Sequence, residues 1–303
     1  MKSDFIWMDG ELVPYDQATV HFITPTLHYG VGVFEGIRCY QTPKGPAVFR
    51  LREHLTRFLE SIHILGMQDF PYTVEDLRQA VHQTIKANGF TECYIRPLMY
   101  LQGPMGLNMD QSRPRVGIAA WEWGPYLGRE AAEKGAHMMV SSFTRLHPNI
   151  NMTKSKVVGN YVNSMLVKTL ALRSGYDEAV ILDPQGYVAE CTGENIFMVR
   201  RGVLYTPPLA TVLEGLTRDA VITFAGDTGI RVEEKLFTRD QLYIADEVFI
   251  TGTAAEMVGI VKVDHRRVKD GQVGPITRSL AQTFTETVHG KGKRSAAWLD
   301  YLD

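Results

Sequence analysis

The sequence predicts a mixed α/β protein of two domains, and three observations support this fold class. First, the 303 residues are 45% hydrophobic and 22% charged, which is ordinary for a globular protein with a substantial core. Second, helix-like and strand-like apolar patterns are mixed without the strict alternation of parallel βαβ units. Third, glycine, proline and a short charged run interrupt these patterns at residues 124–135. We therefore expect a small N-terminal domain at 1–123, a linker at 124–135 and a larger C-terminal domain at 136–303.

The N-terminal half contains clear local signals. A β-hairpin is expected around Asp9-Gly10, because this dipeptide favours a two-residue turn. One apolar helix face is predicted by residues that recur at alternating spacings of four and three: Leu51, Leu55, Phe58, Ile62 and Leu65. A second helix should begin at Thr73, with Asp76 as its capping partner. The strand expected at 93–101 places alternate residues on one side, namely Tyr94, Arg96, Leu98 and Tyr100.

Similar signals predict the elements of the C-terminal half. Strands are expected at 137–142, 178–182 and 247–251, and a helix at 160–174. Further elements are marked by single turn and cap residues: a hairpin at Arg201-Gly202, helices that begin near Thr217 and Thr238, a capping partner at Gln241, and a last helix with Pro275 at its first position.

The bulk composition excludes several classes of function. A net charge of −2 gives no electrostatic reason to expect nucleic acid or an anionic membrane as a partner. The cysteines Cys39, Cys93 and Cys191 are few and far apart, which indicates reduced thiols in a cytoplasmic protein and no metal site. Residues 1–15 carry acids and no apolar core, so they do not resemble a signal peptide. No apolar run reaches the roughly 18 residues that a membrane span needs.

The first segment with chemical potential is Y-G-V-G-V-F-E-G-I-R-C-Y, at 29–40. Gly30, Gly32 and Gly36 indicate that the backbone approaches something closely. A glycine-rich turn between a helix and a strand is the simpler alternative. The segment is not a nucleotide phosphate loop, because it has neither the G-x-G-x-x-G pattern nor the lysine of a Walker motif.

The second segment is a basic set beside the apolar face of the first helix. Arg50, His54 and Arg57 are spaced by four and three residues, so they share one side of the helix. The ordinary interpretation is a solvated helix face. The functional alternative is an anion site, because a guanidinium binds phosphate through two parallel hydrogen bonds.

The third segment is K-S-K-V-V-G-N-Y, at 154–161. Lys156 stands among apolar neighbours just before a helix, where an apolar pocket would favour the neutral, nucleophilic amine. Lys154 has more polar neighbours, and most lysines lie on the surface. The residues alone leave the choice between the two lysines open.

The fourth segment is E-C-T-G-E-N-I-F, at 190–197. Glu190 ends an expected strand and could reach into a cleft, although a surface loop acid is the simpler alternative. Asn195 could equally be a turn residue. Two anion cradles are expected nearby in the chain, at the helix start in 214–219 and in the small-residue turn at 251–255. Each cradle could instead be ordinary capping.

Taken in order, these segments resemble the fold-type IV pyridoxal-phosphate (PLP) enzymes, and among them the branched-chain amino acid aminotransferases. The resemblance covers nearly the whole chain and is carried by the motifs Y-G-x-x-V-F-E-G-I-R, Y-I-R-P, M-G-L-N, K-x-x-G-N-Y, E-x-x-G-E-N-I-F, L-E-G-L-T-R and T-G-T-A-A-E. It implies a fold similar to D-amino acid aminotransferase, with a small N-terminal and a larger C-terminal domain and the active site between them. It also implies homodimers or homohexamers.

The resemblance further implies roles for the cofactor-binding residues. Lys156 should form the Schiff base with PLP and later move the proton, which decides against Lys154. Glu190 should keep the pyridine nitrogen protonated, so that the ring can accept electrons. Tyr161 should hydrogen-bond the phenolic oxygen of the cofactor. The phosphate should be held by Arg57, Leu216, Thr217 and Thr253, and Asn195 should support the site.

The implied reaction transfers the amino group of leucine, isoleucine or valine to 2-oxoglutarate, giving branched-chain 2-oxo acids and glutamate. Residues expected to line an apolar slot for the side chain are Tyr29, Phe34, Tyr126, Met105, Gly106 and Leu107. Arg96, beside Tyr94 on its strand face, should bind the distal carboxylate of glutamate with help from Arg38. The α-carboxylate should meet the turn formed by Thr253, Ala254 and Ala255.

Two alternatives share the same scaffold. One is a D-amino acid or (R)-amine transaminase, and the other is aminodeoxychorismate lyase. The triplet Tyr94-Ile95-Arg96 and the pair Met105-Gly106 favour the branched-chain activity. The sequence does not rank the three amino acids, because one methylene in an apolar pocket changes binding by only about 1–3 kcal/mol.

Overall fold

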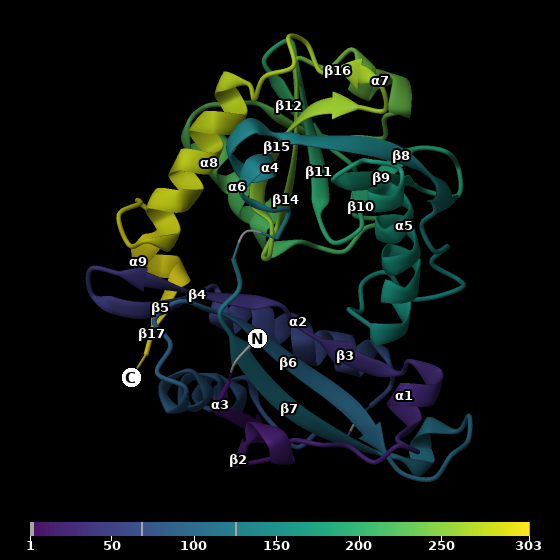
Figure 1. Ribbon diagram of the computed structural model, residues 1–303, viewed down its shortest axis with the longest axis vertical. Coiled ribbons are helices and arrows are strands. Elements are labelled where there is room, and N and C mark those ends of the chain that lie inside the picture. The colour runs from purple at the N-terminus through teal and green to yellow at the C-terminus, as the bar shows by residue number, and fades with distance from the viewer. Residues whose placement is uncertain (1–2, 68, 125, 303) are drawn as a thin grey trace. The chain divides into compact units, whose positions relative to one another are not determined.

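A computed structural model describes residues 3–67, 69–124 and 126–302 (Figure 1). The chain forms two compact units. Unit 1 comprises Met1–Trp123, Lys154–Gly159 and Thr287–Asp303, and unit 2 comprises Gly124–Thr153 and Asn160–Glu286. Unit 1 therefore includes two segments that we expected in the C-terminal domain.

The core of unit 1 is an eight-stranded sheet in the order β17-β5-β4-β6-β7-β1-β2, with β3 paired to β6. Its strands are β1 (Phe5–Met8), β2 (Glu11–Pro14), β3 (Gly32–Phe34), β4 (Ile37–Thr42), β5 (Gly45–Phe49), β6 (Cys93–Gln102), β7 (Arg113–Trp121) and β17 (Leu299–Tyr301). The helices of this unit are α1 (Pro25–Tyr29), α2 (Leu51–Ile64), α3 (Val74–Ala87) and α9 (Ser295–Trp298), with 3₁₀ turns η1 (Tyr15–Gln17) and η2 (Met109–Gln111). Helices α2 and α3 pack together against the sheet (Figure 1).

The local predictions for this half are confirmed. Asp9 and Gly10 adopt positive φ angles of 47° and 108° and join β1 to β2 as a hairpin. The apolar face of α2 is buried in the core of unit 1, and Thr73 and Asp76 form the predicted capping box of α3. Capping removes unpaired backbone groups and is worth about 0.5–2 kcal/mol, so each signal fixes a helix start locally.

Unit 2 is built on a nine-stranded sheet in the order β10-β9-β8-β15-β14-β11-β12-β13, with β16 paired to β15. Its strands are β8 (Ala136–Thr144), β9 (Glu178–Leu182), β10 (Val188–Cys191), β11 (Asn195–Arg200), β12 (Val203–Thr206), β13 (Val232–Glu234), β14 (Glu247–Gly252), β15 (Glu256–Val263) and β16 (Arg266–Arg267). Because β10 pairs with both β9 and β11, the strands from β10 round to β11 form a closed ring. Parallel and antiparallel pairs both occur, which confirms the predicted mixed sheet.

The helices of unit 2 are α4 (Arg129–Lys134), α5 (Tyr161–Arg173), α6 (Leu216–Asp227), α7 (Arg239–Tyr243) and most of α8 (Pro275–Val288). The 3₁₀ turn η3 (Val158–Asn160) precedes α5, and its first two residues belong to unit 1. Thr238 and Gln241 form the expected capping box. The prediction that the helix at Pro275 is the last one is wrong, because the short helix α9 follows it.

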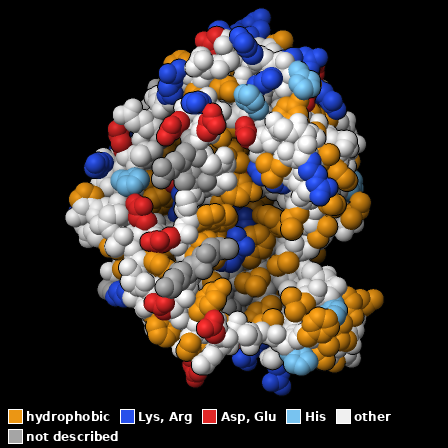
Figure 2. Space-filling model, in the orientation of Figure 1, with side chains coloured by type: hydrophobic (Ala, Val, Ile, Leu, Met, Phe, Trp, Pro, Cys, Tyr) orange, Lys and Arg blue, Asp and Glu red, His pale blue; other side chains and the backbone are white. Residues whose placement is uncertain are grey.

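The surface and cysteine chemistry agree with the sequence. Acidic and basic side chains both occur across the face in Figure 2, as a net charge of −2 implies. Cys39, Cys93 and Cys191 are buried free thiols. Among the helices described, none is long and apolar enough to cross a bilayer. The described residues contain no cluster of three or more His, Cys, Asp or Glu side chains that could hold a metal ion.

Candidate active site

The segment that carries Lys156 is bound to two elements of unit 1. The backbone N–H of Phe34 donates to the carbonyl of Lys156 at 3.1 Å, and Val33 forms a bridge with Val157. On the other side, the backbone N–H of Lys156 donates to Oγ of Ser61 at 3.1 Å. Strand β3 and helix α2 therefore fix the lysine backbone, while Nζ of Lys156 lies 5.3 Å from the centre of the Phe34 ring.

The glycines at 30 and 159 allow this docking. Gly159 N–H donates to the carbonyl of Gly30 at 2.9 Å, and a Cβ on Gly30 would lie 3.1 Å from Cα of Gly159. Gly30 also has a φ of 73°, a backbone conformation that residues with a side chain rarely adopt. The predicted close approach is thus an approach of the chain to itself. Lys154 and Lys156 are both half-buried, so exposure alone does not distinguish them.

The basic face of α2 is buried, so its interpretation as a solvated face is wrong. Arg57 donates from Nε to Oε1 of Glu35 at 2.7 Å and from Nη2 to Oε2 at 2.9 Å. His54 Nδ1 lies 2.8 Å from the same Oε2. Arg50 instead stacks on Trp298 at 5.1 Å and pairs with Glu53 at 2.9 Å. Arg57 and His54 therefore share one acidic partner, Glu35, which the sequence did not single out, whereas Arg50 has other partners.

The charges in this cluster follow from burial and pairing. Burial alone would raise the pKa of Glu35, but the charge of Arg57 and the hydrogen bond with His54 outweigh it and hold that pKa well below its usual value. Burial lowers the pKa of His54 despite its contact with Glu35. Glu35 is therefore a carboxylate, and His54 is neutral at pH 7. Basic side chains that are buried need an acidic partner. The basic residues at helical spacing on α2 were therefore the sequence feature that could have indicated an acid such as Glu35.

Arg96 lies in an aromatic cage on β6. Its guanidinium carbon is 4.6 Å from the centre of Phe34, 5.2 Å from Tyr94 and 5.9 Å from Trp121. Nη2 donates to the hydroxyl of Tyr94 at 3.0 Å, whereas the buried Nε has no partner among the described residues. The cage thus combines apolar surface with a cation that can still accept an anionic partner.

Two neighbours support this cage. A Cβ on Gly36 would overlap the hydroxyl of Tyr94, so glycine permits the tyrosine to lie flat against the chain. Trp123 packs on Tyr94 at 4.7 Å between ring centres, and its carbonyl accepts from Nη2 of Arg38 at 2.7 Å. Trp121 and Trp123 were not predicted, because only the pairing of β6 with β7 brings Trp121 beside Tyr94.

The remaining residues expected to line the substrate slot differ in exposure. Tyr29 and Met105 are 43% and 39% exposed, Leu107 is 87% exposed, and Gly106 between them is also exposed. Tyr126, in unit 2, is half-buried, with its ring 5.1 Å from Nζ of Lys168. Within one chain, the loop at 105–107 is therefore a surface feature.

Glu190 is buried at the end of β10, so the interpretation as a surface loop acid is wrong. Its Oε1 lies 2.5 Å from Nη2 of Arg145. Its Oε2 accepts from Nδ2 of Asn195 at 3.3 Å and from the backbone N–H of Leu213 at 3.2 Å. Asn195 faces Glu190 across the β10–β11 pair and is no turn residue. A carboxylate with these three donors is held in one orientation.

The neighbouring acid Glu194 differs from Glu190 in its partners. Burial, and then the nearby charge of Glu178, raise the pKa of Glu194 to about 8. Its Oε2 accepts only a 3.0 Å contact from Gly193 N–H among the hydrogen bonds of the described residues, whereas Glu178 is bound by Lys168 and Thr192 at 2.8 Å each. Burial therefore favours the protonated form of Glu194, whereas Glu190 is paired with an arginine and has the geometry to hold a cationic N–H.

Helix α6 begins beside this acid. Its N-cap is Gly215, which has no side chain to bind the first N–H groups of the helix. A Cβ on Gly215 would overlap Oδ1 of Asn195, so the helix start and the Glu190 support are in direct contact. Leu216 is half-buried and Thr217 is buried at the first two helical positions. Helix starts of this kind favour anions.

The turn at 253–255 follows directly after strand β14, which pairs with β11. Asn195 pairs with Thr251 across β11 and β14, and Gly252 packs against Gly193, whose carbonyl oxygen would be 3.1 Å from an added Cβ. Oγ1 of Thr251 is buried and has no hydrogen-bond partner among the described residues. Thr253 and Ala254 are half-buried and Ala255 is buried. An unpaired buried hydroxyl costs about 1–3 kcal/mol, which a bound polar group would relieve.

The predicted residues therefore fall into two sets. Unit 1 carries an amine, an oriented guanidinium and an aromatic cage with a cation, at Lys156, Arg57 and Arg96. Unit 2 carries the oriented acid, the half-buried Tyr161 at the start of α5, the start of α6 and the turn after β14, with the predicted residues Tyr161, Glu190, Asn195, Leu216, Thr217, Thr253, Ala254 and Ala255. An amine, an oriented carboxylate, a guanidinium and a helix start are the kinds of group that suit an aldehyde, a protonated ring nitrogen and a phosphate.

Comparison with known proteins gives a consistent result. The family described as amino-transferase class IV matches residues 32–263. A branched-chain-amino-acid aminotransferase of Pseudomonas aeruginosa is 47% identical over 298 residues, which cover 98% of this chain and 97% of that protein.

Solved structures agree in fold over the whole chain. The branched-chain amino acid aminotransferase of Escherichia coli superposes with a TM-score of 0.97 at 44% identity, covering 100% of both chains. A branched-chain aminotransferase from Thermoproteus uzoniensis, with norvaline, gives a TM-score of 0.94 at 44% identity, again with full coverage of both chains. The branched-chain amino acid aminotransferase from Thermobaculum terrenum, in its PLP form, gives 0.92 at 34% identity and covers 99% of both chains.

Proposed function

Because this chain belongs to the amino-transferase class IV family, we propose that it is a PLP-dependent branched-chain-amino-acid transaminase. It transfers the amino group of L-leucine, L-isoleucine or L-valine to 2-oxoglutarate, which yields branched-chain 2-oxo acids and L-glutamate. The observation that carries this proposal is the full-length similarity to enzymes of that name, together with a docked lysine and an arginine-paired acid at the matching motifs.

The described residues fit the cofactor. A phosphate would satisfy the hydroxyl of Thr251, which has no partner among the described residues, and it suits the start of α6, where the N-cap residue is a glycine. In this proposal Arg57, Leu216, Thr217 and Thr253 hold the phosphate. When bound, PLP supplies an electron sink that stabilises negative charge at the substrate Cα.

The chain itself supplies the remaining chemistry. Lys156 would hold the cofactor through Nζ, and the same amine would take up and return the proton at the substrate Cα. Glu190 would accept the ring N–H, and Arg145 and Asn195 hold its carboxylate in one orientation. Tyr161 donates to the phenolic oxygen. Because these groups are positioned before the reaction, little reorganisation is needed when charge develops.

The aromatic cage supports a site with two kinds of substrate. Phe34 and Tyr94 offer apolar surface to a branched side chain, and Arg96 Nε offers a donor to the distal carboxylate of glutamate or 2-oxoglutarate. Arg38 stabilises the wall through Trp123. The α-carboxylate of either substrate binds at the turn of Thr253, Ala254 and Ala255, so the same anchor serves both half-reactions.

Self-association completes the proposal. Tyr29 and the loop Met105-Gly106-Leu107 are exposed in one chain, which supports a homodimer or homohexamer in which a second copy covers or shares these residues. Tyr126 forms a further part of the slot wall. The three free thiols support a reducing compartment, the cytoplasm.

A visible spectrum of the purified protein tests the cofactor and the donor together. We expect a PLP band that changes on adding L-leucine and does not change with D-leucine. Lys156→Ala should abolish turnover, and Lys154→Ala, the matched control, should remain active. A colourless protein that stays colourless with added PLP would contradict the proposal, as would a response to the D-isomer alone.

A further inference from the structure

Glu35 joins two parts of unit 1 that the proposed function uses separately. It follows directly after Phe34, whose N–H binds the backbone of Lys156, and its carboxylate binds Arg57 through both oxygens. We propose that Glu35 is a positioning residue that aims the Arg57 guanidinium at the cofactor phosphate, at a fixed distance from the lysine that binds the aldehyde. This inference rests on the proposed function, because it presupposes that the phosphate is bound by Arg57.

Helix α2 provides the fixed spacing. His54, Arg57 and Ser61 are separated by three and four residues, so all three project from one face of the helix. Ser61 accepts from the N–H of Lys156 through Oγ, and its carbonyl accepts from Oγ of Ser155 at 2.9 Å. One turn earlier, Arg57 binds Glu35. The same helix face therefore holds the lysine segment at one end and the guanidinium at the other.

The contacts of Glu35 leave its carboxylate little freedom. Its side chain is fully buried, and Oε2 accepts from Nη2 of Arg57, lies 2.8 Å from Nδ1 of His54 and accepts from the N–H of Gly36 at 3.2 Å. Oε1 accepts from Nε of Arg57. This two-point pairing fixes the plane of the guanidinium, since Arg and carboxylate form parallel hydrogen bonds. An arginine held this way loses less freedom when it binds a phosphate.

Electrostatics alone predicts the opposite effect for this acid. A carboxylate next to the arginine opposes the approach of a phosphate, and the neutral His54 adds no compensating charge. Removing the charge of Glu35 should then strengthen phosphate binding. If orientation is the main contribution, its removal should weaken binding, so the two explanations differ in sign.

The test compares two probes on the full-length protein freed of cofactor: PLP, and pyridoxal, which lacks the phosphate. For Glu35→Gln we expect PLP affinity to fall about 10- to 100-fold, the equivalent of a lost charge-assisted hydrogen bond. Pyridoxal affinity should change less than about threefold. The matched control is Glu53→Gln, which removes a more exposed acid paired with Arg50 on the same helix and should alter neither affinity.

A double variant shows whether Glu35 acts through Arg57. In an Arg57→Ala background, adding Glu35→Gln should change PLP affinity less than about threefold, because contacts in one network are not additive. Should Glu35→Gln fail to fold, as judged by thermal unfolding, Glu35→Asp keeps the charge but withdraws it by one methylene. It should show a smaller, still PLP-selective loss.

Several outcomes would overturn the inference. Unchanged or tighter PLP binding by Glu35→Gln would favour the electrostatic explanation, and an equal loss for PLP and pyridoxal would indicate general damage. Additive losses in the double variant would show that Glu35 acts independently of Arg57. A wild-type protein that binds neither probe would contradict the proposed function itself, so the two failures are distinguishable.

Discussion

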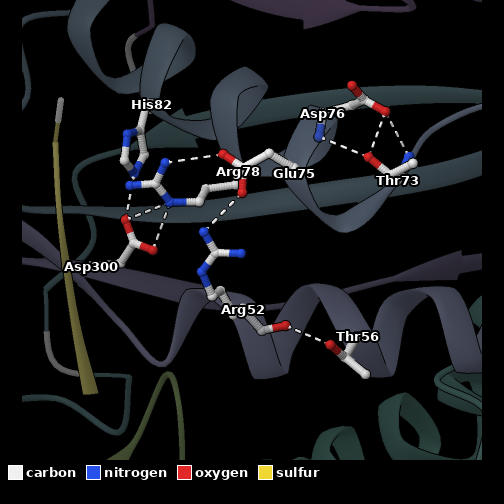
Figure 3. A network of polar contacts seen from close by, with 8 residues as sticks. All are labelled: Arg52, Thr56, Thr73, Glu75, Asp76, Arg78, His82 and Asp300. Atoms are coloured by element: carbon white, nitrogen blue, oxygen red, sulfur yellow. Dashed lines mark hydrogen bonds and ion pairs between the residues drawn. The ribbon is translucent and has the colours of Figure 1, made fainter. Parts of the chain in front are cut away.

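Replacing Asp300 by asparagine should destabilise unit 1, because this carboxylate ties the C-terminal strand β17 to helix α3. Figure 3 shows Asp300 facing Arg78 and His82. Arg78 Nε donates to Oδ2 at 2.8 Å and to Oδ1 at 3.0 Å, and His82 Nε2 lies 2.9 Å from Oδ1. Glu75 binds the same Arg78 from its other side, at 3.3 Å.

The magnitude follows from the pKa of Asp300. Burial alone would raise this pKa, but the hydrogen bonds from His82 and Arg78 and the charge of Arg78 lower it from 3.8 to about 2. That difference corresponds to about 2.5 kcal/mol in favour of the charged form. Because part of the carboxylate meets water, we expect about 1–2 kcal/mol at neutral pH, or roughly 2–8 °C in the unfolding midpoint.

The assay is thermal or urea unfolding of wild type and Asp300→Asn at several pH values. The contribution of Asp300 is fully present above the pKa of the unfolded chain, about 3.8, and is lost as pH falls through about 2. The difference between the two proteins should therefore narrow from pH 4 downward. Glu75→Gln, which removes an exposed acid of the same network, should have a smaller effect. Equal stability at pH 7, or a gap that widens in acid, would refute the reasoning.

Three further changes test the proposed site. Gly215→Ala should weaken PLP binding at least about tenfold in a titration, because the added Cβ would displace Asn195 from Glu190. The control is Gly226→Ala in helix α6, where an added Cβ has nothing within 4 Å, and this variant should bind PLP normally. Arg145→Met should remove the guanidinium that pairs with Glu190 and lower kcat about 10- to 100-fold in steady-state assays. A normal kcat would contradict this role of Arg145. Arg96→Ala should lower kcat/KM for glutamate and 2-oxoglutarate about 10- to 100-fold more than for leucine, and equal losses would remove Arg96 from that role.

The C-terminal segment illustrates what local patterns did not predict. Residues 287–303 belong to unit 1 because β17 pairs with β5, where Asp300 faces Val48. Trp298 stacks under Arg50, and its carbonyl accepts from the Arg50 N–H at 2.7 Å, directly before α2 begins. Pairings between residues some 250 positions apart leave no periodic trace in the sequence.

The residue types at the site were predictable, but their partners were not. Lys156 and Glu190 stand in motifs that can be recognised along the chain, and Arg57 belongs to a basic set at helical spacing. Glu35 and Arg145, which orient Arg57 and Glu190, lie 22 and 45 positions away from them and were missed. Only the docking of β3 on α2, and of the 145 segment on β10, gives these side chains their functions.

The sequence by itself determined the local elements of this protein: the Asp9-Gly10 turn, the apolar face of α2 and the two capping boxes. These features depend on contacts between residues a few positions apart, whose geometry the backbone restricts strongly. The tertiary structure alone decided which charged side chains are buried, which acids have a raised or lowered pKa and which strands pair. Those properties depend on desolvation and long-range pairing, which arise only when distant segments pack together.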